Sequence, residues 1–265
     1  DRQSVVDTVM FGQSVVLDTY LPPQHPLFNA DAVHYDFDVE AGSALLEEVG
    51  WVDNDGDPLT PRLYQGDDPT IPAGTPLSVT YETTDATQRM QAMAVLQNSM
   101  AGCGIEVTLV NSPASEWFAD GPEGKLFGRR FDLGMFAWLT GVEPPCNLYQ
   151  SFESPGVSGE TFISIMTGEE VVMNGWGASN DSGFHDPEYD TVCNQALQSL
   201  PGQPEYETAH LEAQQIFSEL LPVAPLYLRL KLAGTRPDFC NFIMDPTANS
   251  EMFNVEEFDF GDCDQ

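Results

Sequence analysis

A strand–helix–strand segment, followed by one more strand, most constrains the fold of this chain. Residues 77–81 alternate apolar and polar side chains, as a strand with one buried face does, and residues 105–109 repeat the pattern after a helix predicted over 86–101. A crossover of this length makes the two strands parallel. Open parallel sheets bind ligands outside the carboxyl ends of their strands. We therefore predict an α/β fold with a binding site at Trp138, where the last apolar strand ends, and in the loop 139–149 after it.

The chain is strongly acidic, with nine Lys and Arg against 42 Asp and Glu and a formal net charge of −33. Such a surface repels phosphate backbones and anionic lipid headgroups, which argues against nucleic acid as a partner. The acidity has two interpretations, solubility or adaptation to salt on one side and attraction of cationic ligands on the other. No apolar run approaches the roughly 20 residues that span a bilayer.

The first residues already have helical spacing, at Val5, Val6, Val9 and Met10. A positively charged leader with an apolar centre is not among them. We therefore expect the chain to begin partway through a longer protein, with any export leader outside the sequence given.

Five cysteines stand at positions 103, 146, 193, 240 and 263, without a Cys-x-x-Cys pair or a Cys/His spacing that matches a zinc site. Two disulfides and one free thiol would suit an extracytoplasmic protein. A bond between Cys146 and Cys193 would clamp the long loop after the last strand, and one between Cys240 and Cys263 would tie down the C-terminal tail. Buried free thiols are the alternative, so the pairing stays open.

Further helices are predicted outside the crossover. One is capped by Asp36 or Asp38 and runs to about Val49. Two later helices begin at Pro187 and Pro204, since proline is favoured in a first helical turn. The residues expected on core-facing stripes are Ala41, Leu45, Leu46 and Val49 in the first helix, Met90, Met93, Ala94, Gln97 and Ala101 in the crossover helix, and Ala209, Ala213, Ile216, Phe217 and Leu220 in the last.

The remaining segments are predicted as strands, a long loop and a tail. The nearly all-apolar run 131–138 resembles a strand covered on both faces, and residues 223–233 resemble a half-buried strand. The stretch 139–183 is rich in Gly, Ser and Asn, and loops of that length are usually functional or mobile. The acidic, aromatic C-terminal tail is expected to be extended. We therefore divide the chain into an α/β unit, residues 1–236, and a tail, residues 237–265.

The acidic turn at residues 53–57 has some of the features of a calcium-binding loop. Asp53, Asp55 and Asp57 alternate as in a calcium loop, but the sixth and twelfth positions hold Pro58 and Tyr64 instead of glycine and a bidentate glutamate. A solvated acidic turn is therefore favoured over calcium binding, although the sequence does not decide between them.

Catalytic signatures are absent from the sequence. His185 stands eight residues before Cys193, yet no second ligand pair supports a metal site or a Cys–His nucleophile. No Gly-x-Ser-x-Gly elbow, phosphate loop or dinucleotide fingerprint occurs. We therefore predict a binding protein with no catalytic residues, metal or cofactor. The alternatives are a secreted metal-assisted hydrolase that uses the Gly/Asn/Ser-rich loop as its lid, and a calcium-stabilised adhesive module.

Six segments, taken in order, carry the signatures of one family. They are Asp1–Val6, similar to an Ala-Ile-Asp-Arg helix; Tyr35–Trp51, similar to a helix ending in Leu-Leu-x-x-Ala-Gly-Trp; Gly104–Val107, similar to a Gly-Ile-x-Val strand; Phe131–Trp138, similar to the strand before the ligand loop; Gly183–Asp190, similar to Gly-Tyr-x-Asn-Pro-x-Phe-Asp; and Glu212–Tyr227, similar to the helix and strand that follow. In this order they resemble the C-terminal half of the extracellular solute-binding proteins of peptide and nickel ABC transporters, family 5.

This resemblance implies the type II periplasmic-binding architecture, in which two α/β lobes close on a ligand. The chain would supply the second lobe and part of the return to the first. It would belong to the substrate-binding component of an ABC importer, capturing oligopeptides or dipeptides and delivering them to the membrane permease. We expect a full-length monomer that is periplasmic or anchored as a lipoprotein at the outer face of the cytoplasmic membrane. The solute stays open, since peptides, nickel complexes, opines and sugars all occur within this architecture.

The resemblance also implies where the ligand is held. Family members pair the amino terminus of a peptide with an acidic side chain near this loop, and the matching Asp-Pro-like position here is Glu143-Pro144. An exposed loop glutamate is the alternative. Trp138 is a candidate wall of a side-chain pocket, with ordinary core packing as its alternative. The residues expected to bind the ligand are Trp138, Thr140, Gly141, Glu143, Asn180 and Phe184.

Overall fold

The strand–helix–strand crossover forms the centre of the structure. The computed structural model describes residues 1–138, 142–230, 232–245, 248 and 250–263. Strands β3 and β4 are parallel and pair along their whole length, from Ser78 opposite Glu106 to Thr84 opposite Ser112. Strand β5 pairs in parallel with the other side of β3, so that the sheet order is β4-β3-β5. The predicted parallel α/β core is therefore confirmed.

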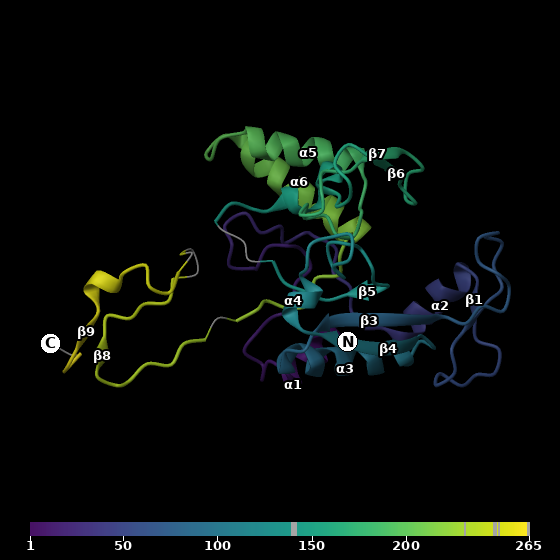
Figure 1. Cartoon of the computed structure of the whole chain (residues 1–265), viewed down its shortest axis with the longest axis horizontal. Helices are drawn as coiled ribbons and strands as arrows, with labels where there is room; N and C mark the ends of the chain where they lie inside the picture. Colours follow the sequence, from purple (N-terminus) through teal and green to yellow (C-terminus); the bar gives the residue numbers. More distant parts are fainter. Residues whose placement is uncertain (139–141, 231, 246–247, 249, 264–265) are drawn as a thin grey trace.

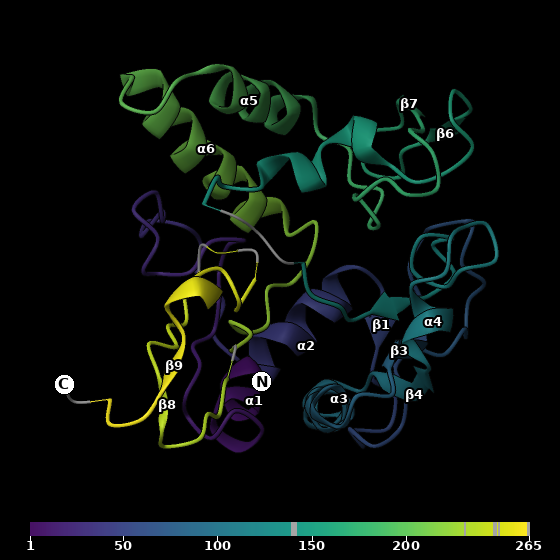
Figure 2. The same ribbon diagram turned by 60° about the vertical axis from the view of Figure 1, so that its left-hand side comes forward.

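Helix α3 packs against this small sheet, and the α5–α6 pair forms a separate region of the molecule. Figure 1 shows α1 and α3 below the sheet and the α5–α6 pair above it, and Figure 2 shows α3 nearly end-on beside the sheet. The helices are α1 (Arg2–Thr8), α2 (Val39–Glu48), α3 (Thr87–Ala101), α4 (Ala114–Trp117), α5 (Pro187–Gln198) and α6 (Pro204–Leu220), with 3-10 turns η1 (Cys146–Tyr149), η2 (Ser151–Glu153) and η3 (Val255–Glu257). The strands are β1 (Trp51–Val52), β2 (Leu63–Tyr64), β3 (Ser78–Thr84), β4 (Glu106–Ser112), β5 (Leu133–Gly134), β6 (Thr161–Ile163), β7 (Glu170–Val172), β8 (Phe239–Cys240) and β9 (Asp259–Phe260).

The strand predicted over 131–138 is much shorter than expected, and β5 keeps only two of its residues. Just after them, the hydroxyl of Thr83 and the guanidinium of Arg89 both donate hydrogen bonds to the carbonyl oxygen of Met135, at 2.6 and 3.0 Å. These side chains occupy the acceptor that a longer backbone ladder would use. The strand is also not covered on both faces, because the side chain of Leu133 is exposed.

Helix α2 has a predicted cap but a different buried face. The side chain of Asp38 accepts a hydrogen bond from a first-turn backbone N–H, as an N-cap does. Leu45 and Val49 were expected in the core but are 64% and 61% exposed. Gly42 instead faces the thiol of Cys103, which a Cβ at this position would approach to 3.2 Å. The partly buried row of α2 is Val39, Gly42, Ser43 and Leu46.

Helices α3 and α6 bury part of the stripes predicted for them. In α3, Met93 is fully buried, whereas Met90 and Ala94 face solvent. The sheet therefore contacts a side of α3 that is rotated from the predicted one. In α6, Leu220 is exposed because it stands at the end of the helix, beyond the packing against α5. The buried apolar residues are Ala92, Met93 and Leu96 in α3, and Ala209, Ala213 and Phe217 in α6.

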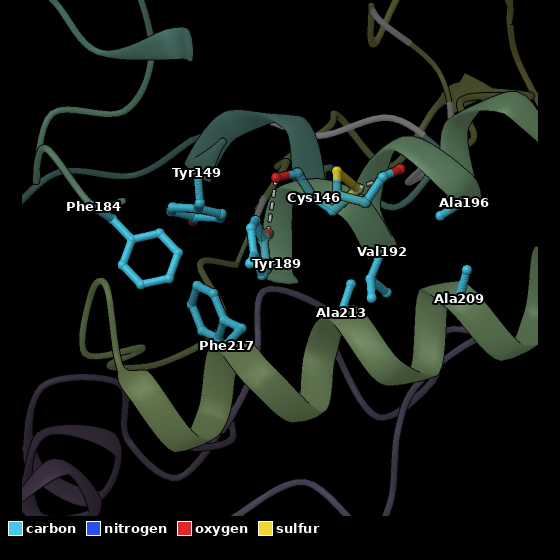
Figure 3. Close-up of a cluster of buried hydrophobic side chains, with 10 residues drawn as sticks. Cys146, Tyr149, Phe184, Tyr189, Val192, Ala196, Ala209, Ala213 and Phe217 are labelled. Carbon is cyan, nitrogen blue, oxygen red and sulfur yellow. Dashed lines mark hydrogen bonds between the residues drawn. A yellow bond between two sulfur atoms is a disulfide. The ribbon is translucent and has the colours of Figure 1, made fainter. Parts of the chain in front are cut away.

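Two separate groups of buried apolar side chains form the interior. The helical cluster, shown in Figure 3, joins α5, α6 and η1, and the phenol of Tyr189 within it donates a hydrogen bond to the carbonyl of Cys146 at 2.8 Å. The sheet cluster joins α1, α3, β3 and β4 with Met135, the residue that follows β5. The helical cluster contains Cys146, Tyr149, Phe184, Tyr189, Val192, Cys193, Ala196, Ala209, Ala213 and Phe217, and the sheet cluster contains Val5, Val9, Met10, Tyr81, Ala92, Met93, Leu96, Val107 and Met135.

The segment after α6 does not form the strand predicted over 223–233. Its described residues make no ladder, although the backbone N–H of Leu228 donates to Val15 at 3.1 Å and neighbouring side chains pack against the sheet cluster. The tail was predicted to be extended rather than helical, but its described residues also include turns and the 3-10 turn η3. Strands β8 and β9 pair in an antiparallel hairpin that Figure 1 shows away from the main sheet. In the described part of the chain, no helix is both long and apolar enough to cross a membrane.

Candidate ligand-binding site at the sheet edge

The carboxyl ends of β3 and β5 form a polar edge of the sheet. Thr83 and Thr84 end β3, and both side chains are buried. Thr83 is tied across to Met135 by the hydrogen bond described above, together with Arg89 from the first turn of α3. The edge therefore joins a strand end, a helix start and the segment that leads into the loop, which is the place where parallel sheets bind ligands.

Trp138 follows this edge with one polar atom that no described residue satisfies. Its ring packs edge-on against Phe136, with centroids 5.3 Å apart. The indole Nε1 is buried, yet it has no hydrogen-bond partner among the described residues. A buried indole N–H usually finds an acceptor. Trp138 therefore presents an apolar ring and one donor that no described residue accepts from, which suits a ligand-contacting side chain.

A buried ion pair lies on β3 next to this edge. The ammonium group of Lys125 is 2.7 Å from a carboxylate oxygen of Glu82 and 3.9 Å from one of Glu116. Glu82 is almost fully buried, and Lys125 is the ion-pair partner shown for its carboxylate. Because the carboxylate is already paired, Glu82 is a structural anchor of the edge. Sequence reasoning missed it, although Lys125 is one of only two lysines in the chain.

Two tyrosines belong to the sheet region next to this edge. Tyr81 belongs to β3, and Tyr227, from the segment after α6, packs against the same sheet cluster. Burial raises the pKa of both phenols. Both hydroxyl groups therefore stay protonated near neutral pH and can donate hydrogen bonds.

Glu143 is exposed on the loop, and α6 partly engages it. The phenol of Tyr206 donates to one of its carboxylate oxygens at 2.7 Å. Partial burial and this hydrogen bond raise the pKa of Tyr206 to about 12. Beside it, the Nε2 of His25 donates to the carbonyl of Val142 at 2.9 Å. Among the described residues, only one oxygen of Glu143 is shown accepting a hydrogen bond, and its pairing with an ammonium group stays a prediction.

Asn180 and Phe184 lie in the interior of the helical layer and not at the sheet edge. The amide of Asn180 donates to the carbonyls of Gln150 and Phe184 at 3.0 and 2.8 Å. Phe184 packs edge-on against Tyr189 within the helical cluster. Both side chains hold the loop together, and a ligand contact by either one stays a prediction. Thr140 and Gly141 lie outside the described residues.

Two disulfides fix the segments that flank this region. Cys146 is bonded to Cys193 and Cys240 to Cys263, and Cys103 is a free thiol. The first bond joins η1, at the end of the loop after Trp138, to α5. The start of the helical layer is therefore covalently held where the loop arrives from the sheet edge.

The acidic turn is organised by its own backbone. Asp53 accepts hydrogen bonds from two following backbone N–H groups. Asp55 accepts from the N–H of Asp57 and from the hydroxyl of Thr60, and these bonds lower the pKa of its carboxyl group. Over the described ranges, no group of three or more His, Cys, Asp or Glu side chains is arranged to hold a metal ion. This arrangement favours the solvated turn.

A family model and the curated relatives both match this chain to solute-binding proteins. The model of bacterial extracellular solute-binding proteins, family 5 (Middle), matches residues 1–160. The oligopeptide-binding protein OppA of Bacillus subtilis is 26% identical over 235 residues, covering 86% of this chain and 35% of OppA. The nickel-binding periplasmic protein of Escherichia coli is 28% identical over 134 residues, covering 49% of this chain and 24% of that protein. The chain thus spans about a third or less of the length of these curated relatives.

Solved structures share the fold. An oligopeptide-binding protein of Thermus thermophilus, in complex with a pentapeptide, superposes with a TM-score of 0.69 at 23% identity, covering 91% of this chain and 38% of that one. The oligopeptide-binding protein AppA of Bacillus subtilis, in complex with a nonapeptide, also gives 0.69, at 19% identity, covering 99% and 45% of the two chains. The chain therefore has the fold of part of a type II periplasmic binding protein, as predicted.

Proposed function

Because the chain belongs to the bacterial extracellular solute-binding proteins of family 5, we propose that it is part of the substrate receptor of an ABC importer. The receptor would capture oligopeptides or dipeptides outside the cytoplasmic membrane and deliver them to the permease. The relatives are oligopeptide-binding, peptide-transport and nickel-binding periplasmic proteins, which supports an extracytoplasmic location. Disulfides also favour that compartment.

The observation that best supports binding is the polar edge of the parallel sheet. There the indole N–H of Trp138 is buried without a partner among the described residues, beside a strand end that is braced by Thr83 and Arg89. A rigid edge with an unused donor suits recognition of a backbone carbonyl or a similar acceptor. Glu143, which accepts from Tyr206 through one oxygen, would pair with an ammonium group of the solute.

The mechanism would be capture without chemistry. Residues 1–236 would form the second lobe and residues 237–265 would return toward the first, and hinge closure of the lobes would enclose the ligand. The relatives reported above are binding proteins, so we set aside the alternative of a metal-assisted hydrolase with a Gly/Asn/Ser-rich lid.

The test is ligand identification on the natural full-length protein, purified without denaturation and analysed by mass spectrometry. We expect bound peptides, and we expect Trp138→Leu to weaken their binding about tenfold or more, since a buried aromatic contact is a typical hot spot. Trp51→Leu is the matched control, because Trp51 packs against Tyr64 in another sheet. Recovery of the protein without any peptide, together with turnover of model peptides, would overturn the proposal.

Glu143 is tested separately with one peptide in two forms, with a free and with an acetylated amino terminus. If Glu143 pairs with the ammonium group, Glu143→Gln weakens binding of the free form and leaves that of the acetylated form unchanged. The exposed Glu40 on α2 provides the control substitution Glu40→Gln. Equal effects of Glu143→Gln on both forms would assign Glu143 to the surface.

A further inference from the structure

Helix α6 carries a row of three polar side chains, at Tyr206, His210 and Gln214. Residues four apart lie above one another on a helix, so the three share one side of it. His210 and Gln214 are almost fully buried, and Tyr206 is partly exposed. The ring of His210 packs edge-on against that of Tyr206, with centroids 4.6 Å apart. This polar row is separate from the apolar residues of α6 that join the helical cluster.

Gln214 fixes the irregular segment that follows α1 on the surface of α6. Its side-chain oxygen accepts hydrogen bonds from the hydroxyl of Thr19 and from the backbone N–H of Asn29, both at 3.1 Å. Its side-chain N–H donates to the carbonyl of Leu27 at 2.7 Å. Figure 2 shows this segment next to α6. The part of the segment that contains His25 is therefore held in place.

His25 is held in one neutral form. The backbone N–H of Leu27 donates to its Nδ1 at 3.1 Å, and its Nε2 lies 2.9 Å from the carbonyl oxygen of Val142. A backbone N–H can only donate and a carbonyl can only accept, so Nδ1 has no proton and Nε2 carries one. A second proton, on Nδ1, would face the N–H of Leu27 and break that bond. The placement of His25 against Val142 therefore depends on a neutral imidazole.

His210 is also accommodated only as a neutral ring. It is 1% exposed, and neither ring nitrogen has a hydrogen-bond partner among the described residues. Burial lowers the pKa of His210, the carboxylate of Glu143 opposes that shift, and the charge of His25 adds to it. The phenol of Tyr206 also faces this ring, and the α5 side chains that are buried against α6 carry no charge. Protonation of His210 would therefore place a charge in a site without acceptors.

These contacts converge on the loop after Trp138, at Val142 and Glu143. His25 donates to the carbonyl of Val142, and Tyr206 donates to the carboxylate of Glu143 at 2.7 Å. The loop is thus held from two sides, by the segment after α1 and by α6. The first support is an imidazole, and the second packs against one. Both imidazoles fit the structure only without a charge.

We propose that His25 and His210 are positioning residues for the loop after Trp138, and that acid releases the loop by protonating them. The inference rests on the proposed binding function and adds its regulation by pH. The held loop needs neutral rings, a condition that is met near neutral pH and lost as the pH falls. A free imidazole has a pKa of about 6.5, so at about pH 5.5 protonation favours the released loop by up to about tenfold for each ring.

The experiment measures the affinity of the full-length protein for trialanine by calorimetry, at about pH 7.5 and about pH 5.5. We expect binding to be about tenfold weaker at the lower pH. In the double variant His25→Gln/His210→Phe, neither side chain can titrate, and the ratio of the two affinities should approach one. His34→Gln is the matched control and should keep the wild-type ratio, since His34 contacts Asp18 and Asp36 instead of the loop. His25→Gln alone should reduce the ratio, which keeps the test valid if the double variant fails to fold.

A second readout separates this inference from the proposed function. Hydrogen exchange of residues 142–150 is measured without ligand at both pH values and corrected for the pH dependence of the chemical exchange rate. Loss of protection at the lower pH in the wild type, but not in the double variant, supports the release even if no peptide binds and the peptide proposal fails.

The other outcomes overturn the inference. If trialanine binds equally at both pH values and protection is unchanged, the positioning role is overturned and the receptor function stands. If the pH dependence persists in the double variant, another group titrates and the two histidines are not responsible. If no peptide binds and protection is unchanged, both proposals are overturned.

Discussion

The sheet cluster and the helical cluster are stabilised by different interactions. The sheet cluster is mainly aliphatic, and a parallel ladder fixes its strands. The helical cluster has no sheet beneath it and depends on aromatic rings, with Phe217 edge-on to Tyr149 at 4.9 Å and to Tyr20 at 5.1 Å, and on the Cys146–Cys193 disulfide. Backbone hydrogen bonds along the strands stabilise the sheet region, whereas ring contacts and a disulfide stabilise the helical region. Because the ladder holds the strands along their length, the side chains at the strand ends are available for a binding site.

The largest expected effect comes from the aromatic centre of the helical cluster. Phe217→Ala should lower the free energy of unfolding by about 3–5 kcal/mol, because it removes a fully buried ring and leaves a cavity. Urea denaturation measures the change, and hydrogen exchange should show loss of protection in α5 and α6 before β3 and β4. Leu220→Ala, at an exposed position of the same helix, is the control. Equal loss of protection in both regions would show that the two clusters unfold as one unit.

The disulfide is the next way to sharpen the comparison. Replacing Cys146 and Cys193 by Ala should cost about 2–4 kcal/mol, since the bond closes a segment with a sequence separation of 47. The loss should appear in the helical cluster, because the ladder of the sheet region contains no disulfide. Thermal unfolding measures the total loss of stability, and hydrogen exchange shows in which region it occurs. Cys103→Ala is the control. Loss of protection in β3 and β4 alone would contradict the division into two regions.

The sequence predicted the parts of the molecule that rest on local patterns. Alternation and spacing were enough for β3, α3 and β4, and the strand-end rule placed Trp138 beside the polar edge. The buried face of α2 was predicted wrongly because Gly42 faces Cys103, and hydrophobic periodicity cannot identify a packing position without a side chain. The early end of β5 depends on Arg89, which is distant in sequence.

Asp181 lies near Arg129, where the helical region meets the sheet region. We expect its replacement to change stability less than loss of the disulfide and more than a substitution on the exposed side of α2. It is 5% exposed, and neither carboxylate oxygen has a hydrogen-bond partner in the described part of the chain. Burial raises the pKa of Asp181 to about 7, while the charge of Arg129, from the sheet side, opposes that shift. The folded state therefore favours the protonated acid, whose pKa is about 3.9 in an unfolded chain. This contribution to stability is complete below about pH 4 and is lost as the pH rises toward 7.

Asp181→Asn should accordingly raise the free energy of unfolding at neutral pH by about 1–3 kcal/mol, since it removes a buried, poorly paired charge. It should also flatten the decline in stability between pH 4 and 7. Urea denaturation across that range provides the measurement, with the exposed Asp67→Asn as the control. An unchanged pH dependence in Asp181→Asn would show that another group titrates.

The smallest effect is expected on α2, which belongs to neither cluster. Leu45→Ala should change the free energy of unfolding by less than about 0.5 kcal/mol, because the side chain is 64% exposed and alanine is a good helix former. Leu46→Ala, one position on and partly buried, should cost about 1–2 kcal/mol. If the stripe expected from the sequence were correct, the two losses would be similar and large. The ratio of the two losses, measured by urea denaturation, therefore shows which side of α2 faces the interior. A larger loss at Leu45 than at Leu46 would show that Leu45, and not Leu46, faces it.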